Sequence, residues 1–255
     1  MSGLRAALWV EARKARAARV LHVAAVLLVI GAAVLSASLT AAVEAGNEQI
    51  VAKLGQAAGS EGWPLLTATV TQIVAAGAVL TFGLTLSWQF GREFTDGTAY
   101  GLCALPVSRT AQVVAKFVVH TVWTLAVAAV LVGFVVLTGL AVGLGRPDHG
   151  DPAALGRLLV LCVLGGLVAA PAAVAATLGR GPMPGIAATV GVIVLAQVSV
   201  AAAPASSAWI PLAAPALWAM RPDQVSLAQL GLTAVTAVVF AALTARAWSR
   251  LELDR

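Results

Sequence analysis

Six long apolar segments dominate the sequence and limit what the chain can fold into. They lie near residues 20–42, 66–90, 113–143, 157–178, 185–203 and 226–247. Each is long enough to cross a bilayer, which takes about 20 residues of α-helix, and the third is long enough to tilt or to continue beyond the membrane. The period-two alternation of apolar and polar residues that marks membrane β-barrel strands is absent. The sequence therefore predicts an all-α integral membrane protein with six transmembrane helices.

The composition agrees with this class. Hydrophobic residues make up 60% of the chain and charged residues 11%, with a mean hydropathy of +0.93, whereas soluble domains carry about 25% charged residues. The first apolar segment is longer than the apolar core of a signal peptide, about 7–15 residues, so we expect an uncleaved anchor. We expect one transmembrane domain over 1–255, made of an N-terminal interfacial helix (1–19), a six-span bundle (20–248) and a cytoplasmic tail (249–255).

The basic residues predict the orientation in the membrane. Twelve of the 16 fall on the side of the N-terminus if six spans are threaded, and four fall on the other side: Lys53, Arg146, Arg157 and Arg221. Because an excess of Lys and Arg marks cytoplasmic loops, both termini are expected in the cytoplasm, with the protein in a bacterial inner membrane. The net charge of +5 reflects this asymmetry. It does not indicate nucleic-acid binding, which would need a basic face on a soluble domain.

One dense polar stretch, "GREFTDGTAYGLCALPVSRTAQVVAK" at 91–116, interrupts the apolar pattern between the second and third spans. Phe94, Thr98, Gly101 and Leu105 recur at helical spacing and predict a short amphipathic helix over 92–105. Pro106 is expected to end this helix and Ser108 to cap the next one. A solvated connector is the alternative interpretation of the stretch.

The same stretch resembles the motif of ABC-2 type export permeases, particularly the bacitracin-export-like branch. The matching residues are Glu93, Phe94, Gly97, Thr98, Leu105, Pro106, Val107, Ser108, Arg109 and Lys116, within a stretch of about a tenth of the chain. The resemblance implies a cytoplasmic coupling helix that docks into a cleft of a separate ATPase subunit. Its implied docking residues are Arg92, Glu93, Phe94, Asp96, Gly97, Thr98, Tyr100, Pro106, Ser108 and Arg109. It also implies two ATPase subunits, which carry ATP and Mg, and a second permease subunit, either identical or a paralogue.

The N-terminal segment has its own helical pattern. Its apolar face carries Leu4, Leu8, Ala15 and Ala18, and its other face carries Arg5, Trp9, Arg13 and Arg16. This pattern predicts a helix at the membrane surface, with basic side chains near lipid headgroups. Glu11 is an exception on the apolar face. It is expected to pair with Lys14 three residues on, and the resemblance implies a connecting helix in which Glu11 contacts the coupling helix or the ATPase; both interpretations stay open.

The apolar cores of the predicted spans carry no Asp, Glu, Lys or Arg. Ion-coupled carriers and pumps usually place ionisable groups there. The chain also has neither a phosphate-binding Gly-rich Lys-Ser/Thr loop nor a Gly-x-Ser-x-Gly nucleophile motif. We therefore expect no catalytic site and no cofactor or metal on this chain, and an energy source on an ATP-hydrolysing partner. Gln72, Gln89 and Gln197 are expected to pack or to form interhelical hydrogen bonds.

The segment 204–224 is apolar but is broken by Pro204, Pro211, Pro215 and Pro222, which prevent a regular spanning helix. Trp209 and Trp218 suit the interfacial belt of a membrane protein. The resemblance implies short re-entrant helices that form an outer gate from Trp209, Pro211, Pro215 and Trp218. An interfacial loop without a transport role is the alternative.

These observations predict the permease subunit of an ATP-binding cassette exporter for a hydrophobic or amphipathic substrate. Two other functions remain open: a membrane scaffold or assembly protein without transport, and a carrier or channel that works alone. The sequence leaves open the identity of the substrate and does not exclude import.

Overall fold

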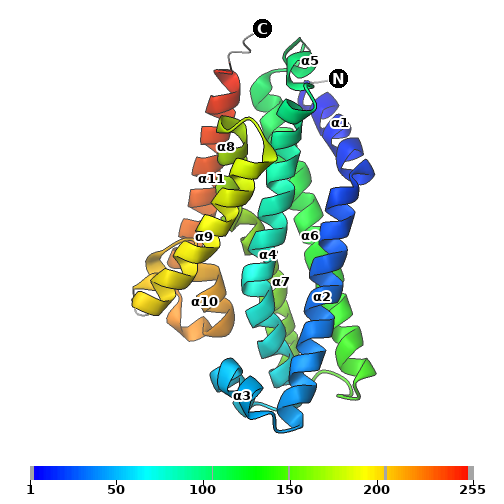
Figure 1. Cartoon of the computed structure of the whole chain (residues 1–255), viewed down its shortest axis with the longest axis vertical. Helices are drawn as coiled ribbons and strands as arrows, with labels where there is room; N and C mark the ends of the chain where they lie inside the picture. Colours follow the sequence, from blue (N-terminus) through cyan, green and yellow to red (C-terminus); the bar gives the residue numbers. More distant parts are fainter. Residues whose placement is uncertain (1–2, 105, 149, 204–205, 252–255) are drawn as a thin grey trace.

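The structure is a computed structural model that describes residues 3–104, 106–148, 150–203 and 206–251. Helices account for 85% of the chain, and the described residues form no β-strand. The helices run mostly side by side along the long axis of the molecule (Figure 1). The predicted all-α class is therefore confirmed.

Six helical segments are long and apolar enough to cross a membrane, as predicted. They are α2 (Arg19–Glu44), α4 (Gly62–Thr95), α6 (Arg109–Ala141), the pair α7 (Asp151–Val168) and α8 (Pro171–Leu178), α9 (Pro182–Ala202) and α11 (Leu227–Ser249). The fourth span is broken between α7 and α8, because Pro171 has no N–H to donate and its ring clashes with the preceding turn of a continuous helix.

Helix α4 is the central element of the bundle. It packs against α2, α6, α7, α8 and α9 (Figure 1). The largest apolar core forms along it, where Leu66, Val70 and Phe82 meet Leu131 of α6 and Leu158 of α7, all fully buried. The position of α4 explains why its residues 92–95 can contact several other helices at once.

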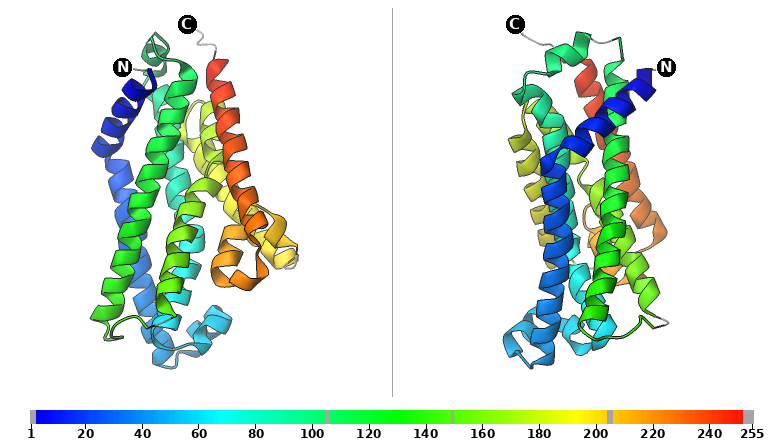
Figure 2. Two further views of the ribbon diagram at one scale, coloured as in Figure 1. Left: turned by 180° about the vertical axis from the view of Figure 1, so that it is seen from behind. Right: turned by 90° about the vertical axis from the view of Figure 1, so that its right-hand side faces the viewer.

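The two ends of the bundle differ in their elements. One end carries α1 (Gly3–Ala17), α5 (Ala99–Ala104), the turn between α8 and α9, and the end of α11 (Figures 1 and 2). We call it the basic end, because the chain places most of its Lys and Arg residues there. The opposite end carries α3 (Glu48–Leu54), the 3-10 turn η1 (Gly55–Gly59) and the loop between α6 and α7. All four segments that the charge pattern assigns to one side thus lie at one end.

The proline-rich segment forms three short elements: η2 (Ser207–Trp209), α10 (Ala214–Met220) and η3 (Pro222–Gln224). No spanning helix occurs in its described part, as the prolines predict. Helix α10 packs against α4 and α7 and lies nearer the middle of the molecule than α3 does (Figure 1). Pro215 is buried and Trp218 is partly buried, whereas Trp209 is 62% exposed. The gate role of these residues remains a prediction.

Close backbone contact near the basic end gives the first testable prediction. A Cβ added to Gly91 of α4 would overlap backbone atoms of Gly181 and Pro182 in the α8–α9 turn. Since backbone cannot move aside as a flexible side chain can, Gly91→Ala should destabilise the protein by about 1–3 kcal/mol. Thermal unfolding of the purified protein in detergent measures this. The matched control is Gly133→Ala in α6, where no atom lies within 4 Å; equal unfolding temperatures for both variants would contradict the packing described.

Candidate functional site

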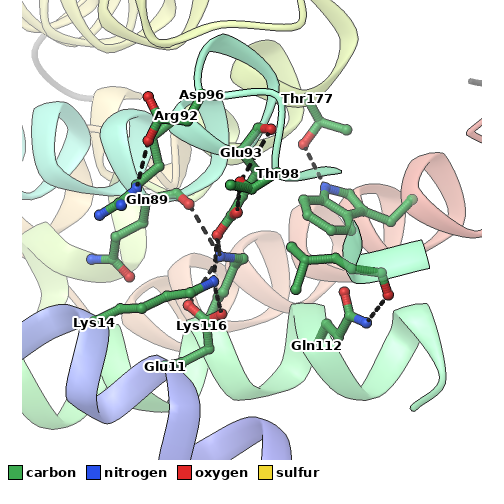
Figure 3. Close-up of polar contacts among 12 residues, drawn as sticks. Glu11, Lys14, Gln89, Arg92, Glu93, Asp96, Thr98, Gln112, Lys116 and Thr177 are labelled. Carbon is green, nitrogen blue, oxygen red and sulfur yellow. Dashed lines mark hydrogen bonds and ion pairs between the residues drawn. The ribbon is translucent and has the colours of Figure 1, made fainter. Parts of the chain in front are cut away.

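The carboxylate of Glu93, near the end of α4, is almost fully buried, with 1% of the residue exposed. Its Oε1 atom lies 2.7 Å from the Nζ atom of Lys116 on α6 and 2.8 Å from the Nζ atom of Lys14 on α1. Its Oε2 atom accepts a hydrogen bond of 2.6 Å from the hydroxyl of Thr98 (Figure 3). One carboxylate therefore joins α4 to two other helices and to the segment that precedes α5.

Glu11 of α1 supplies a second carboxylate to the same place. Its Oε2 atom lies 2.9 Å from Lys116 Nζ, and its Oε1 atom lies 3.0 Å from Lys14 Nζ. Lys116 also donates to the backbone carbonyl of Gln89, at 3.2 Å. We call Glu11, Lys14, Glu93 and Lys116 the ionic cluster (Figure 3). Two positive and two negative groups balance there, and each lysine contacts both carboxylates.

The ionic cluster accounts for the position of α1. The chain leaves helical geometry at Ala18, between α1 and α2, and α1 then crosses α6 at an angle (Figure 2). Its buried face carries Ala7 and Glu11. The predicted Glu11–Lys14 pair is confirmed. Leu4, predicted on the apolar face of this helix, is 39% exposed, so the face of α1 that meets the bundle is specified by Glu11 and Ala7.

The outer face of α1 retains an amphipathic character. Trp9 is 58% exposed, and the guanidinium of Arg13 stacks on its ring at 4.6 Å. An exposed tryptophan beside a basic side chain is typical of a helix at the boundary between lipid and water. The membrane-surface position of α1 remains a prediction.

Burial makes the pairing in the ionic cluster energetically important. A buried charge that loses its partner costs several kcal/mol, whereas a fully paired one is far less costly. Burial by itself would lower the pKa of Lys14, but the nearby carboxylates of Glu11 and Glu93 outweigh it and raise this pKa above its usual value of 10.5. Because the folded-state pKa is raised, the contribution of Lys14 to stability is complete below pH 10.5 and is lost as pH rises through the folded-state pKa.

The single helix predicted over 92–105 is wrong. Helix α4 continues to Thr95, a turn follows at Asp96 and Gly97, and α5 covers only Ala99–Ala104. Gly97 has a φ of +69°, a left-handed conformation that glycine adopts readily. The hydroxyl of Thr98 turns back to Glu93. Leu105, the last member of the predicted stripe, lies outside the described residues.

The other predicted docking residues separate into buried contacts and exposed positions. Arg92 lies 3.4 Å from Asp96 and stacks on the ring of Trp88 at 4.4 Å. Phe94 is partly buried and meets the ring of Trp248 edge-on, with centroids 6.0 Å apart. The side chain of Tyr100 lies outside what the structure describes.

Ser108 and Arg109 both act on helix ends. The hydroxyl of Ser108 accepts from the backbone N–H of Ala111 at 3.2 Å, which confirms the predicted cap of α6. Arg109, predicted as a docking residue, donates instead to the carbonyls of Trp248 and Leu251, at 3.3 and 2.9 Å. The Trp248 carbonyl lies in the last turn of α11 and the Leu251 carbonyl lies two residues beyond its end at Ser249, so Arg109 connects the start of α6 to the C-terminal end of α11.

Glu93, which the resemblance implies as a docking residue, does not lie on the surface: the structure buries it against partners within the chain. A contact of Glu93 with an ATPase remains a prediction. The exposed positions of the predicted set are Asp96, Gly97, Thr98, Pro106 and Ser108. We call these five residues the exposed turn.

The sequence interpretation missed the partner roles of Lys116 and Trp248. Lys116 was identified only as a motif residue, and the indole of Trp248 donates to Thr177 at 3.0 Å and packs against Phe90. The partner role of Lys116 could have been predicted from its position inside an apolar segment, because a lysine there needs a nearby carboxylate. Among the predicted glutamine contacts, Gln89 does form an interhelical hydrogen bond, at 3.2 Å to His120. Within the described residues, no group of three or more His, Cys, Asp or Glu could hold a metal ion.

The balance of charges in the ionic cluster gives the second prediction. Glu93→Gln leaves two lysines facing one carboxylate, and Lys116→Met leaves two carboxylates facing one lysine. Each should destabilise the folded protein by about 3–5 kcal/mol. The double variant Glu93→Gln/Lys116→Met restores equal charge, so it should be less destabilised than the sum of its single changes, by about 0.5–3 kcal/mol.

Unfolding temperatures of the single and double variants measure this coupling. The matched control is Glu44→Gln, which changes an exposed carboxylate at the end of α2. Additive losses in the double variant would show that the four groups do not act as one cluster.

The comparison with curated proteins found no match. A protein-family model described as "ABC-2 family transporter protein" matches residues 7–197, which cover α1 from its second turn to most of α9 and include all four residues of the ionic cluster. This match covers about three quarters of the chain. The chain therefore belongs to the ABC-2 family of transporter proteins, as the motif around Glu93 predicts, and is a membrane permease component of an ABC transporter.

Proposed function

We propose that this permease couples ATP hydrolysis on a separate ATPase subunit to the export of a hydrophobic or amphipathic substrate. In this proposal two ATPase subunits bind at the basic end, and a second permease subunit, identical or a paralogue, completes the transporter. The protein lies in a bacterial inner membrane with both termini in the cytoplasm. Family membership implies an ABC ATPase partner; the docking site, the direction and the substrate are our proposal.

The exposed turn, directly connected to the ionic cluster, is the observation that carries the docking site. Asp96 is about half exposed, and Gly97 has no neighbouring atom within 4 Å of its Cβ position. The next residue, Thr98, donates to buried Glu93. A partner that binds the turn would therefore contact a segment with a direct hydrogen bond to the interior of the bundle.

Further contacts connect the same segment to other helices. Gln112 of α6 donates to the carbonyl of Leu102 in α5, at 3.0 Å. Arg109, at the start of α6, holds the end of α11, and Glu93 contacts α1 and α6. A displacement of the exposed turn by an ATPase would be transmitted through these contacts to α1, α4, α6 and α11. This is a mechanical route from ATP hydrolysis to the spans.

The bundle itself has surfaces that suit lipid and a second permease subunit. Large apolar side chains are exposed along α2, α9 and α11, among them Leu27, Val194 and Val238. An apolar face of this kind is expected in contact with lipid tails or with another transmembrane helix. A scaffold without transport would also have such faces, so transport itself has to be measured.

The third prediction concerns docking. Asp96→Lys reverses an exposed charge, and Gly97→Val forces a β-branched residue into a left-handed backbone conformation. If the turn contacts the ATPase, each variant should reduce the co-purified ATPase at least tenfold. For Asp96→Lys the reason is the loss of a charged interface contact, which costs about 2–5 kcal/mol; for Gly97→Val it is the changed shape of the turn. The amount of ATPase isolated with the tagged permease and its turnover are the measurements.

The control for docking is Asp148→Lys, an exposed acidic residue in the α6–α7 loop at the opposite end. It should leave the co-purified ATPase unchanged. If Asp96→Lys and Gly97→Val keep a normal level of bound ATPase and full export, the exposed turn is an ordinary connector.

The fourth prediction concerns the energy source. Purified permease in vesicles should move no substrate in response to ATP or a proton gradient, and should do so only when the ATPase is added with ATP. Flux from vesicles that contain the permease alone would favour a stand-alone carrier.

The fifth prediction concerns orientation. Single cysteines at positions 96 and 48 lie at opposite ends of the molecule (Figure 1). In intact cells a membrane-impermeant thiol reagent should label position 48 and leave position 96 unlabelled. The reverse pattern would overturn the cytoplasmic placement of the basic end.

A further inference from the structure

Two adjoining cavities lie between α4, α7, α9 and α10, toward the opposite end of the molecule. The larger has a volume of about 620 Å³ and the smaller about 200 Å³. Gln72, Met220 and Arg221 line both, so the two spaces meet at these residues. Gln72 was predicted to pack or to bond to another helix, but no partner for its amide occurs within the described part of the chain.

The larger cavity is lined by two unpaired cations. Arg157 of α7 is partly exposed and Arg221, just after α10, is exposed. Among the residues that the structure describes, neither guanidinium has an ion pair or a hydrogen bond. The cavity also contains Asp151, but one oxygen of this carboxylate already accepts from the backbone N–H of Asp148, at 2.7 Å. The two guanidinium groups without partners outnumber the single carboxylate, which already accepts a hydrogen bond, so the larger cavity favours binding of an anion.

The smaller cavity has the opposite character. Its walls are mostly aliphatic and include Val79, Val168, Val192, Leu212 and Leu217. These side chains come from α4, α7, α9 and the α10 region, so the space lies among the spans. An apolar space of this kind binds hydrocarbon, because burial of apolar surface is favourable in proportion to its area.

We propose that the two cavities form one binding site for an anionic amphiphile. The acidic headgroup, a phosphate or a carboxylate, lies between Arg157 and Arg221, and the alkyl tail enters the smaller cavity past Gln72. Guanidinium groups suit this headgroup, since they bind phosphate and carboxylate through paired N–H donors. The assignment names the class of the transported substrate and, as a substrate assignment, rests on the proposed transport function.

The position of the site adds to this assignment. The larger cavity is lined in part by Leu54, Gly55 and Gly150, which belong to the end away from the exposed turn, so in the proposed orientation it lies on the side of the cell exterior. A molecule held there has its charged group near the membrane boundary and its tail among the spans. This arrangement matches the way an amphiphile lies in a bilayer, with its headgroup in water and its tail in hydrocarbon.

The test uses the full-length protein in a neutral detergent and three probes: octyl phosphate, inorganic phosphate and octanol. Native mass spectrometry gives the fraction bound and hence the dissociation constant of each. Octyl phosphate should bind at least tenfold more tightly than either fragment, because it alone fills both cavities. Equal affinity for inorganic phosphate would exclude the apolar part of the site, and equal affinity for octanol would exclude the cationic part; either result overturns the proposal.

Variants assign the binding to the named residues. Arg157→Gln and Arg221→Gln should each weaken octyl phosphate binding about tenfold, the loss expected for one charge-assisted hydrogen bond. Ala196→Leu should instead narrow the smaller cavity, which Ala196 lines, and should remove the advantage of octyl phosphate over inorganic phosphate. The matched control is Arg146→Gln, an exposed arginine in the α6–α7 loop that lines neither cavity; it should bind as the unchanged protein does.

Folding and ATPase binding are measured separately from binding of octyl phosphate. Because both arginines lack partners among the described residues, their variants should unfold at the temperature of the unchanged protein. The same preparations are assayed for bound ATPase. Bound ATPase without binding of octyl phosphate would overturn this site and leave the permease proposal standing. Binding that depends on Arg157 and Arg221, without any ATPase, would support the site and contradict the proposed function.

Discussion

The ionic cluster at the basic end is the interaction on which the arrangement of this end depends. Lys116 has almost no contact with solvent, so its charge is tolerable only because Glu11 and Glu93 lie within 2.9 Å of its Nζ atom. Removing either carboxylate would leave a buried cation without a full set of partners, which is far more costly than the same change at the surface. Helix α1 is therefore attached to the bundle by a requirement for charge balance.

The cluster also gives the exposed turn its connection to the spans. Thr98 contacts Glu93 from the exposed turn, Lys116 contacts it from within the bundle, and Lys14 contacts it from α1. The two carboxylates and two lysines lie on three helices, so a shift of one helix changes the contacts of the others. A partner that moves the exposed turn would thus act on α1, α4 and α6 together. The amphiphile site at the opposite end is lined partly by α4, the same helix that carries Glu93.

The sequence predicted the spans well but predicted the site only in part. Long apolar segments specify membrane helices through their length and composition, so the six spans could be predicted, as could the Ser108 cap and the absence of a spanning helix in the proline-rich segment 204–224. The break of the fourth span at Pro171 was not predicted. The direction in which Glu93 points depends on which helix lies beside it, and a pattern within 92–105 does not contain that information. The helical spacing of Phe94 and Thr98 misled the prediction, because the conformation of Gly97 ends α4 between them. Neither cavity was predicted, since its walls come from segments far apart in the chain.

A disulfide cross-link between the start of α1 and the segment after α5 tests the role of the ionic cluster most directly. A Cβ at Gly3 would lie within 4 Å of the Cα atom and of both γ-carbons of Val107, so cysteines at these two positions would be in contact. With Cys103 and Cys162 replaced by Ser, Gly3→Cys/Val107→Cys should cross-link rapidly under mild oxidation. Adding Glu93→Gln should slow the reaction at least tenfold, because α1 loses its anchor, whereas adding Glu44→Gln should not. Equal cross-linking rates with and without the Glu93 carboxylate would contradict the claim that the cluster holds α1 against the bundle.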